Sequence, residues 1–499
     1  MNTRITFFIA CAIASILAIV IGSSLAEENY RLLYLLILIA CLSISIILPQ
    51  LLTILTVFAF SSGLTLPQLE GKMNLFYVFA ASLAGVAILR YSMDRKMPIL
   101  WSKAHAWLIV FASVILMIMI IRGAGLRILG DEKWGGMFYI QLFISISLVF
   151  VIPRASLSKG VWRPVLVAAA LAPFLPVIAG FLASSGSSSL LAFVQADAQT
   201  ASQISQLASG GNVQIERFFS LGYAGQSAYN ILFYFLSVQS IFGRALFLSI
   251  PFGIVVLILV GLSGFRSSLL NIGLFTTLML KVNRAISFGK ILIFTLIVLI
   301  FYVFAFLFAP SLPSSIQRML SILPGISIAT HISSDAESTT EWRIEVWKRG
   351  LRYIPDYWLI GKGYAFSSRE MLAVTDPKTG LFDPTDWAII QSAYHQGLLS
   401  LLLGLGVPGL VSGILMYYLF VKRHLQLQKM QWDDPILLRC HQVVTINILT
   451  SFIIFVMIYG DVQSSFPTLF FNLAILEGLW ATNIKSTKNS DGLGLILNN

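Results

Sequence analysis

The chain has 499 residues, of which 57% are apolar and only 11% are charged, and its formal net charge is +11. A typical soluble domain is about 25% charged, so a chain of this composition could not cover its own surface in water. An ordinary soluble protein is therefore excluded. In a membrane protein the positive charge is explained by basic cytoplasmic loops, so no nucleic-acid partner is expected.

Apolar runs of about 16 to 21 residues recur along the chain, and each is long enough to cross a hydrocarbon core as a helix. A helix satisfies its backbone hydrogen bonds internally there, so we predict an all-α polytopic membrane protein with about 12–14 transmembrane helices. The predicted spans are 5–25, 32–48, 51–66, 74–90, 105–121, 137–152, 163–182, 225–242, 245–262, 268–281, 289–309, 397–420, 443–459 and 466–482.

Two of these spans need comment. Span 5–25 is predicted to be a retained helix, because Ser23-Ser24-Leu25-Ala26 is a poor signal-peptide cleavage site. Span 225–242 is the weakest, because Gln226, Ser227, Asn230 and Gln239 dilute its apolar character.

The distribution of lysine and arginine predicts the orientation. With the N-terminus inside, the basic residues concentrate in cytoplasmic connectors, such as the loop with Arg90, Arg95, Lys96 and Lys103. This bias favours cytoplasmic N and C termini. The three cysteines, Cys11, Cys41 and Cys440, have no CxxC spacing, so no disulfide framework or metal site is implied.

The predicted organisation follows from these spans. It comprises N-terminal transmembrane helices (1–182), an outer loop (183–224), central transmembrane helices (225–309), a large extracytoplasmic loop (310–394), C-terminal transmembrane helices (395–482) and a disordered cytoplasmic tail (483–499). The large loop is long enough to form a helical subdomain. Within it, Ser338-Thr339-Thr340-Glu341 is typical of a capping box, so a helix is predicted to start at Ser338.

Four residues at the predicted outer face could carry chemistry: Arg217, Arg266, Arg343 and His395. Guanidinium groups bind phosphate oxygens bidentately and keep their charge, so the arginines suit a membrane-anchored diphosphate. The predicted helix start at Ser338 would add a positive dipole end. A neutral imidazole can accept a proton from a sugar hydroxyl, which makes His395 a candidate general base. Each arginine taken alone is also explained as an interfacial anchor, and His395 as a structural histidine.

The segment from about 210 to 420 resembles the O-antigen ligase and polysaccharide polymerase superfamily of bacterial envelope enzymes. Ser263-Gly264-Phe265-Arg266-Ser267-Ser268-Leu269 is similar to its Ser-x-Ser-Arg-Gly-x-Leu element, with departures at Phe265 and Ser267. Arg343 and Trp347, then Pro355 and Gly361-Lys362-Gly363, resemble its Arg-x3-Trp and Pro-x-x-x-Gly-x-Gly stretch, with a longer gap. His395-Gln396, with Gly406 and Gly409, resembles its His-Asn element and the Gly-x-x-Gly helix that follows, with Gln in place of Asn.

The resemblance implies a GT-C-like, metal-independent, inverting glycosyltransferase with no cofactor. It would transfer a glycan from undecaprenyl diphosphate to an acceptor glycan or glycolipid, at the outer face of the bacterial cytoplasmic (inner) membrane. His395 would be the catalytic base, and Arg217, Arg266 and Arg343 would bind the diphosphate. Polymerisation of O-antigen or exopolysaccharide repeat units is the expected activity, with a chain-length regulator as a partner besides membrane lipid. Ligation of O-antigen to the lipid A-core of lipopolysaccharide is the alternative.

Two rival hypotheses start from other residues. Glu27 and Glu28 in the first outer loop could hold a divalent metal, as acidic residues do in other GT-C enzymes. Adjacent carboxylates in a short loop are usually only solvated, and the same explanation applies to Asp131 and Glu132. A lipid-linked oligosaccharide flippase would have a similar number of spans, and Glu477, with Asn271, Asn447 and Asn472, would then be its polar groups. Such asparagines more often form interhelical hydrogen bonds, and the large loop and lack of repeats favour the enzyme.

Overall fold

The fold comes from a computed structural model, which describes residues 40, 43, 49–65, 74–93, 101–126, 133–155, 157–184, 219–285, 287–374 and 383–491. The first predicted span, 5–25, lies outside the described residues, and only two residues of 32–48 are described. Each predicted span from 51–66 onward is mostly helical, but 163–182 is divided between two helices and 225–242 between a long helix and a four-residue one. The prediction of an all-α polytopic membrane protein is confirmed.

The described N-terminal part contains α3 (Pro49–Ser62), α4 (Leu75–Met93), α5 (Lys103–Arg122), the short strand β1 (Lys133–Trp134), α6 (Met137–Val151), the 3-10 helix η2 (Ile152–Ala155), α7 (Lys159–Leu171) and α8 (Phe174–Ser184). The central part contains α10 (Phe219–Phe235), α11 (Val238–Ile241), α12 (Leu246–Leu262), α13 (Arg266–Val282) and α14 (Phe288–Phe308). The C-terminal part contains α20 (Gly397–Leu427), α21 (Pro435–Met457) and α22 (Val462–Asp491).

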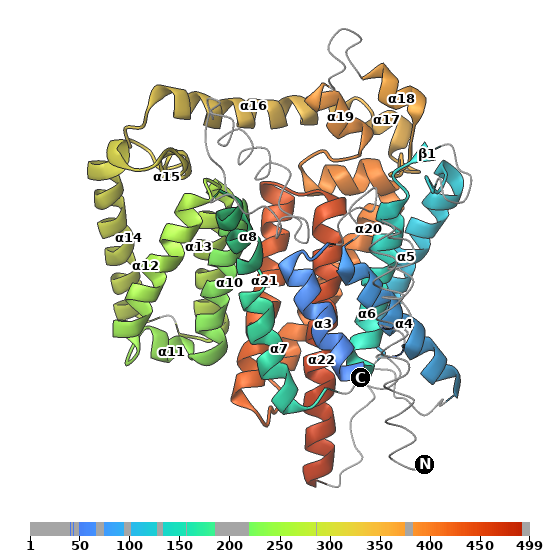
Figure 1. The fold of residues 1–499 in the computed structure, drawn as a ribbon, viewed down its shortest axis with the longest axis horizontal. Helices are drawn as coiled ribbons and strands as arrows, with labels where there is room; N and C mark the ends of the chain where they lie inside the picture. Colours follow the sequence, from blue (N-terminus) through green and yellow to red (C-terminus); the bar gives the residue numbers. More distant parts are fainter. Residues whose placement is uncertain are drawn as a thin grey trace.

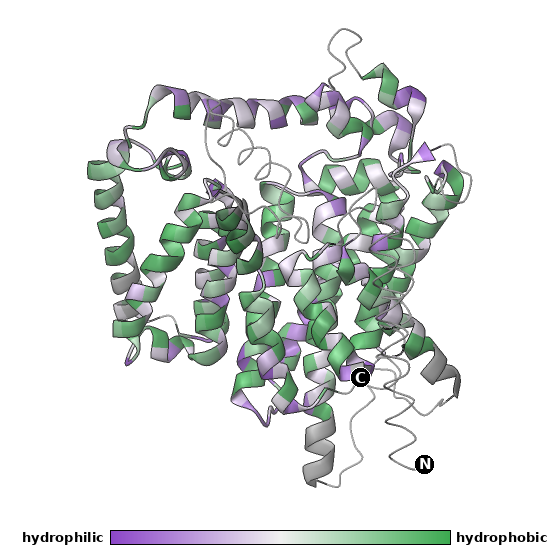
Figure 2. Cartoon of the chain, viewed as in Figure 1, coloured by the Kyte–Doolittle hydropathy of each residue, from purple (hydrophilic) through white to green (hydrophobic). Residues whose placement is uncertain are grey.

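Among the described residues, five helical segments are long and apolar enough to cross a membrane: Lys103–Arg122, Met137–Arg154, Lys159–Leu182, Gly397–Leu427 and Pro435–Met457. Shorter apolar helices accompany them, and Figure 2 shows hydrophobic residues along most of the length of the bundle helices. On α14, for example, Leu296, Ile300 and Leu307 are more than half exposed. Apolar residues on the outer surface are stable only against lipid, which explains why these helices lack a polar face.

The large loop crosses one end of this bundle. It contains η4 (Ala309–Ser311), α15 (Ser314–Leu320), α16 (Thr330–Leu351), α17 (Ile354–Tyr357), β2 (Phe366–Ser367), α18 (Ser368–Ala373) and α19 (Pro384–Ile390). The 22 residues of α16 span about 33 Å. Figure 1 shows α16 lying across the top of the helices, from α15 at one side to α17, α18 and α19 at the other.

Three details of the predicted organisation are corrected. Helix α16 starts at Thr330 with Ala329 as its N-cap, so Ser338 lies inside the helix and its hydroxyl donates to the Asp335 carbonyl at 3.0 Å. The capping box and the dipole end at Ser338 are therefore wrong, because the eight residues before it already have helical hydrogen bonds. Helix α10 begins at Phe219, before the predicted end of the outer loop at 224. Helix α22 continues to Asp491, into the tail predicted to be disordered.

Helix α20 is interrupted at Gly406, whose φ of 68° and ψ of −177° are not helical. The backbone groups freed there bind the segment after α17. The Val407 amide donates to the Trp358 carbonyl at 2.7 Å, and the amides of Lys362 and Gly363 donate to the carbonyls of Leu403 and Gly404 at 2.8 and 3.0 Å. The large loop is thus joined to α20 by main-chain hydrogen bonds.

Candidate active site

His395 lies on the short connection between α19 and α20 and has an uncommon backbone conformation. Its φ is 53°, and that of nearby Ser392 is 58°; both are left-handed conformations that cost free energy in residues other than glycine. The surrounding structure holds this conformation. The Ser392 hydroxyl donates to the Gly363 carbonyl at 2.9 Å, and the fully buried Tyr394 packs in a cluster with Val346 and Leu403.

Gln396, where the related motif has Asn, caps the next helix. Its side-chain oxygen accepts a hydrogen bond from the Leu399 amide, and its Nε2 donates to the Val456 carbonyl at 3.1 Å. Gln396 therefore ties the start of α20 to the end of α21 and holds the backbone next to His395.

Asp461, on the turn between α21 and α22, holds His395 from the other side. The His395 amide donates to Asp461 Oδ1 at 2.8 Å, and His395 Nδ1 lies 3.0 Å from Asp461 Oδ2. The Asp461 side chain is buried, and that of His395 is 17% exposed. A proton on Nδ1, directed to the carboxylate, leaves the lone pair on Nε2. This is the arrangement that a general base requires.

Two aromatic rings position the imidazole. The ring of Trp342, from α16, lies 5.0 Å from it, and the ring of Tyr459 stacks on it at 5.1 Å with an interplanar angle of 18°. The guanidinium carbon of Arg343 lies 5.2 Å above the same Tyr459 ring, within the range of a cation–π interaction. Tyr459 thus contacts both His395 and Arg343, which are 52 residues apart in the chain.

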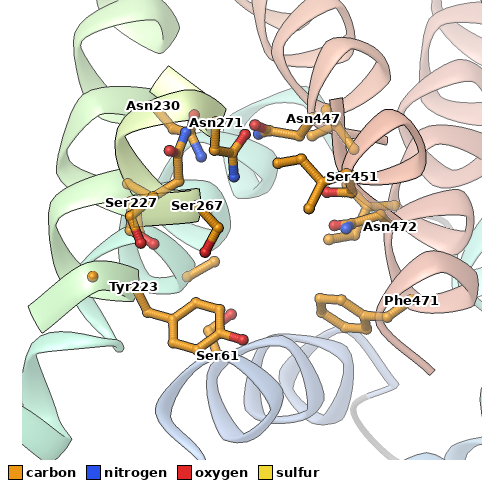
Figure 3. Close-up of a pocket in the computed structure, with 18 of the residues that line it drawn as sticks. Ser61, Tyr223, Ser227, Asn230, Ser267, Asn271, Asn447, Ser451, Phe471 and Asn472 are labelled. Carbon is orange, nitrogen blue, oxygen red and sulfur yellow. The ribbon is translucent and has the colours of Figure 1, made fainter. Parts of the chain in front are cut away.

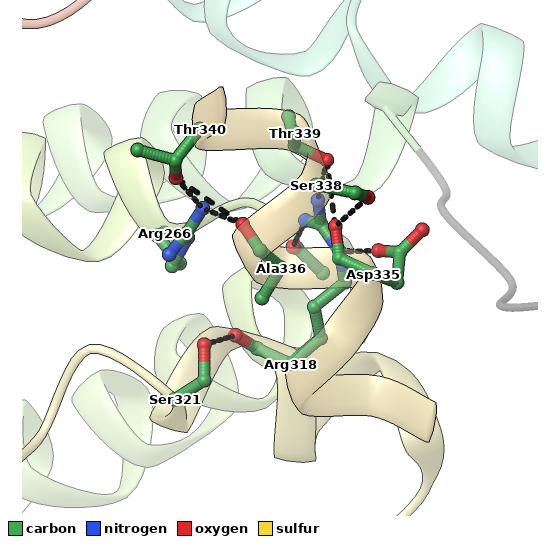
Figure 4. Close-up of polar contacts among 9 residues, drawn as sticks. Arg266, Arg318, Ser321, Asp335, Ala336, Ser338, Thr339 and Thr340 are labelled. Carbon is green, nitrogen blue, oxygen red and sulfur yellow. Dashed lines mark hydrogen bonds and ion pairs between the residues drawn. The ribbon is translucent and has the colours of Figure 1, made fainter. Parts of the chain in front are cut away.

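Arg266 lies in the first turn of α13 and reaches the same helix, α16. Its Nη2 donates to the Ala336 carbonyl at 3.0 Å and to Thr340 Oγ1 at 3.3 Å (Figure 4). Thr340 and Arg343 are three residues apart, so they are neighbours on one face of the helix. Two of the three predicted arginines therefore lie about one helical turn apart along α16.

A second arginine near Arg266 has a structural role. Arg318, on α15, is almost fully buried; its Nε donates to Asp335 Oδ2 at 2.6 Å, its Nη1 to the Gly264 carbonyl at 2.8 Å and its Nη2 to Thr339 Oγ1 at 3.2 Å. Figure 4 shows Arg318 beside Asp335 and Thr339 of α16, and its bond to the Gly264 carbonyl joins this helix to the turn before Arg266. Because its donors are engaged by the protein, Arg318 fixes α16 and Arg266 relative to each other.

Lys362, within the Gly361-Lys362-Gly363 element, also faces the protein. Its Nζ donates to the carbonyls of Ile389 and Ile390 at 3.2 and 2.9 Å, and burial lowers the pKa of this amine to about 8. An alanine Cβ at Gly361 would lie 2.2 Å from the Gly404 carbonyl oxygen. This element therefore serves the packing of the loop on α20.

The structure describes some of the site residues that the sequence predicted and leaves others outside the described residues. His395, Arg343 and Arg266 are gathered around α16 by the contacts above, whereas Arg217, Glu27, Glu28, Asp131 and Glu132 lie outside the described residues. Sequence reasoning missed Asp461, Tyr459 and Trp342. The available signal for Asp461 was a single acidic residue in a tight turn between two spans, at the same predicted face as His395.

Residues 251–414 match the family model described as O-Antigen ligase. The chain carries an O-antigen ligase family domain. This confirms the superfamily that the motifs indicated and gives a multi-pass membrane enzyme of the ligase and polymerase type. The matched segment runs from α12 into α20, so it contains Arg266, Arg343 and His395, while Asp461 and Tyr459 follow it. A search of curated proteins found no match.

Proposed function

We propose that this O-antigen ligase family protein is a glycosyltransferase that joins undecaprenyl-diphosphate-linked glycans and polymerises their repeat units. The observation that supports the proposal is the placement of His395, held by buried Asp461, beside Arg343 under α16. A base and two fixed cations at one end of an apolar bundle suit a neutral acceptor hydroxyl and an anionic lipid-linked donor.

The proposed reaction is a single displacement. His395 Nε2 accepts the proton of the acceptor hydroxyl while its oxygen forms a bond to the anomeric carbon of the donor. The bond from that carbon to the diphosphate oxygen breaks, and the configuration inverts. Arg266 and Arg343, with Arg217 as a further candidate, stabilise the charge on the departing undecaprenyl diphosphate. No step needs a metal ion or cofactor.

The orientation in the bacterial inner membrane belongs to the same proposal. Lys103, Arg423 and Arg439 lie at the end of the bundle opposite α16, near helix termini that pack around α22. Basic connectors remain on the cytoplasmic side, so α16 would face the periplasm and the termini the cytoplasm.

Ligation is the second candidate, because the matching family is described as an O-antigen ligase. A ligase would pass the glycan to lipid A-core, and a polymerase to another lipid-linked repeat unit. The number of predicted spans and the long loop favour the polymerase.

The test is a transfer assay on purified protein in nanodiscs, with undecaprenyl-diphosphate-linked repeat units from the host, EDTA and no nucleotide. We expect a ladder of longer lipid-linked glycans on a gel. His395→Ala is expected to reduce the rate by about 10²- to 10⁴-fold, because the general base is lost. Arg343→Gln and Arg266→Ala are expected to reduce it through weaker stabilisation of the diphosphate.

Matched controls come from α16 itself. His331 is exposed at its start, and Arg349 forms ion pairs with Glu345 and Asp386. His331→Ala and Arg349→Ala should therefore retain the ladder. Activity only with lipid A-core would make the protein a ligase. Normal transfer by folded His395→Ala would remove the assigned base, and no transfer to either acceptor would favour the flippase.

A further inference from the structure

A cavity of about 330 Å³ lies between helices of the bundle. Residues of α3, α7, α10, α13, α21 and α22 line it. Its size is at the lower end of the range of about 300–1,000 Å³ for small-molecule sites. Such sites are mostly apolar, and so is the interior of a membrane protein. The lining of this cavity is likewise mostly apolar, but it also carries a group of uncharged polar side chains.

The polar side chains of the lining are uncharged. Gln226, Asn230, Asn271, Asn447 and Asn472 come from four helices, together with several serines. Figure 3 shows the labelled side chains around one open space, with Tyr223 and Phe471 facing each other across it. Of the described residues that line the cavity, none is acidic, basic or a histidine. The polar side chains therefore suit a neutral ligand with hydrogen-bonding groups, whereas a diphosphate would find no cation among the described lining residues.

Several of these amides lack a partner within the described protein. Both polar atoms of Gln226 and the Oδ1 atoms of Asn230 and Asn271 are buried without a hydrogen bond to the protein. Buried polar groups are nearly always paired, so a set of unpaired amides around one cavity requires an explanation. Amides offer both donors and acceptors, the combination that sugar hydroxyls use. Asn271 Oδ1 therefore makes no interhelical hydrogen bond within the described protein.

The cavity adjoins the candidate active site at two points. Tyr459 lines it, and its ring stacks on the His395 imidazole. Phe265 and Ser267, on either side of Arg266, line it as well. A ligand in the cavity would therefore lie close to the ring that stacks on His395 and to the residues on either side of Arg266.

We propose that this cavity binds one or two neutral sugar units of the glycan and so selects which sugar reaches His395. The inference rests on the proposed function, because the sugar could belong to the lipid-linked donor or to the acceptor. Both sources present the same hydroxyl-rich chemistry. A site with fixed amides discriminates strongly against a sugar whose hydroxyls leave those amides unpaired.

A binding experiment tests the cavity independently of glycan transfer. The probe is the host repeat-unit glycan released from its lipid by mild acid, titrated against the full protein in nanodiscs by calorimetry. We expect wild type to bind it, and Asn271→Leu and Asn472→Leu each to raise the Kd about tenfold or more through loss of a buried amide partner. Thr277→Val is the matched control, because Thr277 is exposed on the same helix as Asn271.

A second arm identifies the source. In the transfer assay, Asn271→Leu is expected to raise the KM of the donor alone if the donor sugar occupies the cavity, or of the acceptor alone if the acceptor sugar does. If Asn271→Leu does not fold, Asn271→Ser replaces it, with a smaller effect in the same direction.

Unchanged binding and unchanged KM values in both leucine variants would overturn the proposal while leaving the glycosyltransferase intact. Glycan binding that the variants weaken, in a protein that transfers nothing, would support the cavity and reject the proposed function instead.

Discussion

At the scale of single residues, the site depends on a residue that the known motifs do not contain. Sequence patterns identified His395 and Arg343, because each lies in a short segment similar to a family element. They could not identify Asp461, which belongs to a different pair of helices and follows the matched segment. Its role is visible only from its two contacts with His395, at the backbone amide and at Nδ1.

Asp461→Asn tests this positioning role. The amide oxygen can still accept from the His395 backbone, but the carboxylate that orients Nδ1 and stabilises the protonated ring is lost. We expect kcat for transfer to fall by about 10²- to 10⁴-fold with little change in KM. Steady-state kinetics in nanodiscs would measure both. Asp433→Asn is the control, because Asp433 pairs with Lys159 at the opposite end of the bundle. A variant with raised KM and unchanged kcat would contradict the assignment.

At the scale of elements, the sequence predicted most helices but not how they end. Apolar runs determine where helices form, since any such run must satisfy its backbone in lipid. The start of a helix depends on which hydrogen bonds the residues near its end form. In α16 the residues before Ser338 already belong to the helix, and the Ser338 hydroxyl donates to the Asp335 carbonyl within it. The sequence likewise did not predict the interruption of α20 at Gly406, because Gly406 lies within a continuous apolar run.

Gly406→Ala tests the interruption. Alanine disfavours a φ of 68°, and its Cβ would lie 2.5 Å from the Leu359 carbonyl oxygen. We expect a loss of stability of about 1–3 kcal/mol or more and a lower transfer rate, because the segment at Trp358–Gly363 would move away from α20. Thermal unfolding in detergent would measure the first effect. Gly273→Ala is the control, since nothing lies within 4 Å of its Cβ; equal effects of the two changes would refute the explanation.

At the scale of the whole molecule, the N-terminal helices position the large loop although the matched family segment begins at residue 251. Arg122, at the end of α5, donates to the carbonyls of Gly361 and Ile360 at 2.8 and 3.0 Å. The Tyr364 amide donates to the Tyr139 hydroxyl at 2.9 Å, and β1 pairs with β2 in an antiparallel register. The region that the sequence explained only as membrane spans therefore supports the site.

A buried charge network holds the opposite end together. Glu477 on α22 is fully buried and pairs with Arg423, while the Nε2 atoms of His424 and His105 lie 3.3 and 3.8 Å from it. It joins α5, α20 and α22 and is not among the residues that line the cavity. This gives Glu477 a structural role in place of the transport role considered from the sequence.

Glu477→Ala is expected to destabilise the protein by about 3–5 kcal/mol, because it leaves the partly buried Arg423 without its partner. The double variant Glu477→Leu with Arg423→Met is expected to regain most of that stability, since no unpaired charge remains. Thermal unfolding of the purified proteins would measure both. A double variant less stable than Glu477→Ala would contradict a purely structural pair.

The sequence by itself determined the membrane setting, the order of the helices, the superfamily and three of the residues around α16, because composition and local patterns carry that information. The tertiary structure decided which side chains meet. Asp461 and Tyr459 reach His395 from the turn between α21 and α22, and Trp342 reaches it from α16. The asparagines of four helices gather around one cavity. In an apolar bundle, packing against the neighbouring helices determines which side of each helix points into the protein. No pattern within a single helix identifies that side.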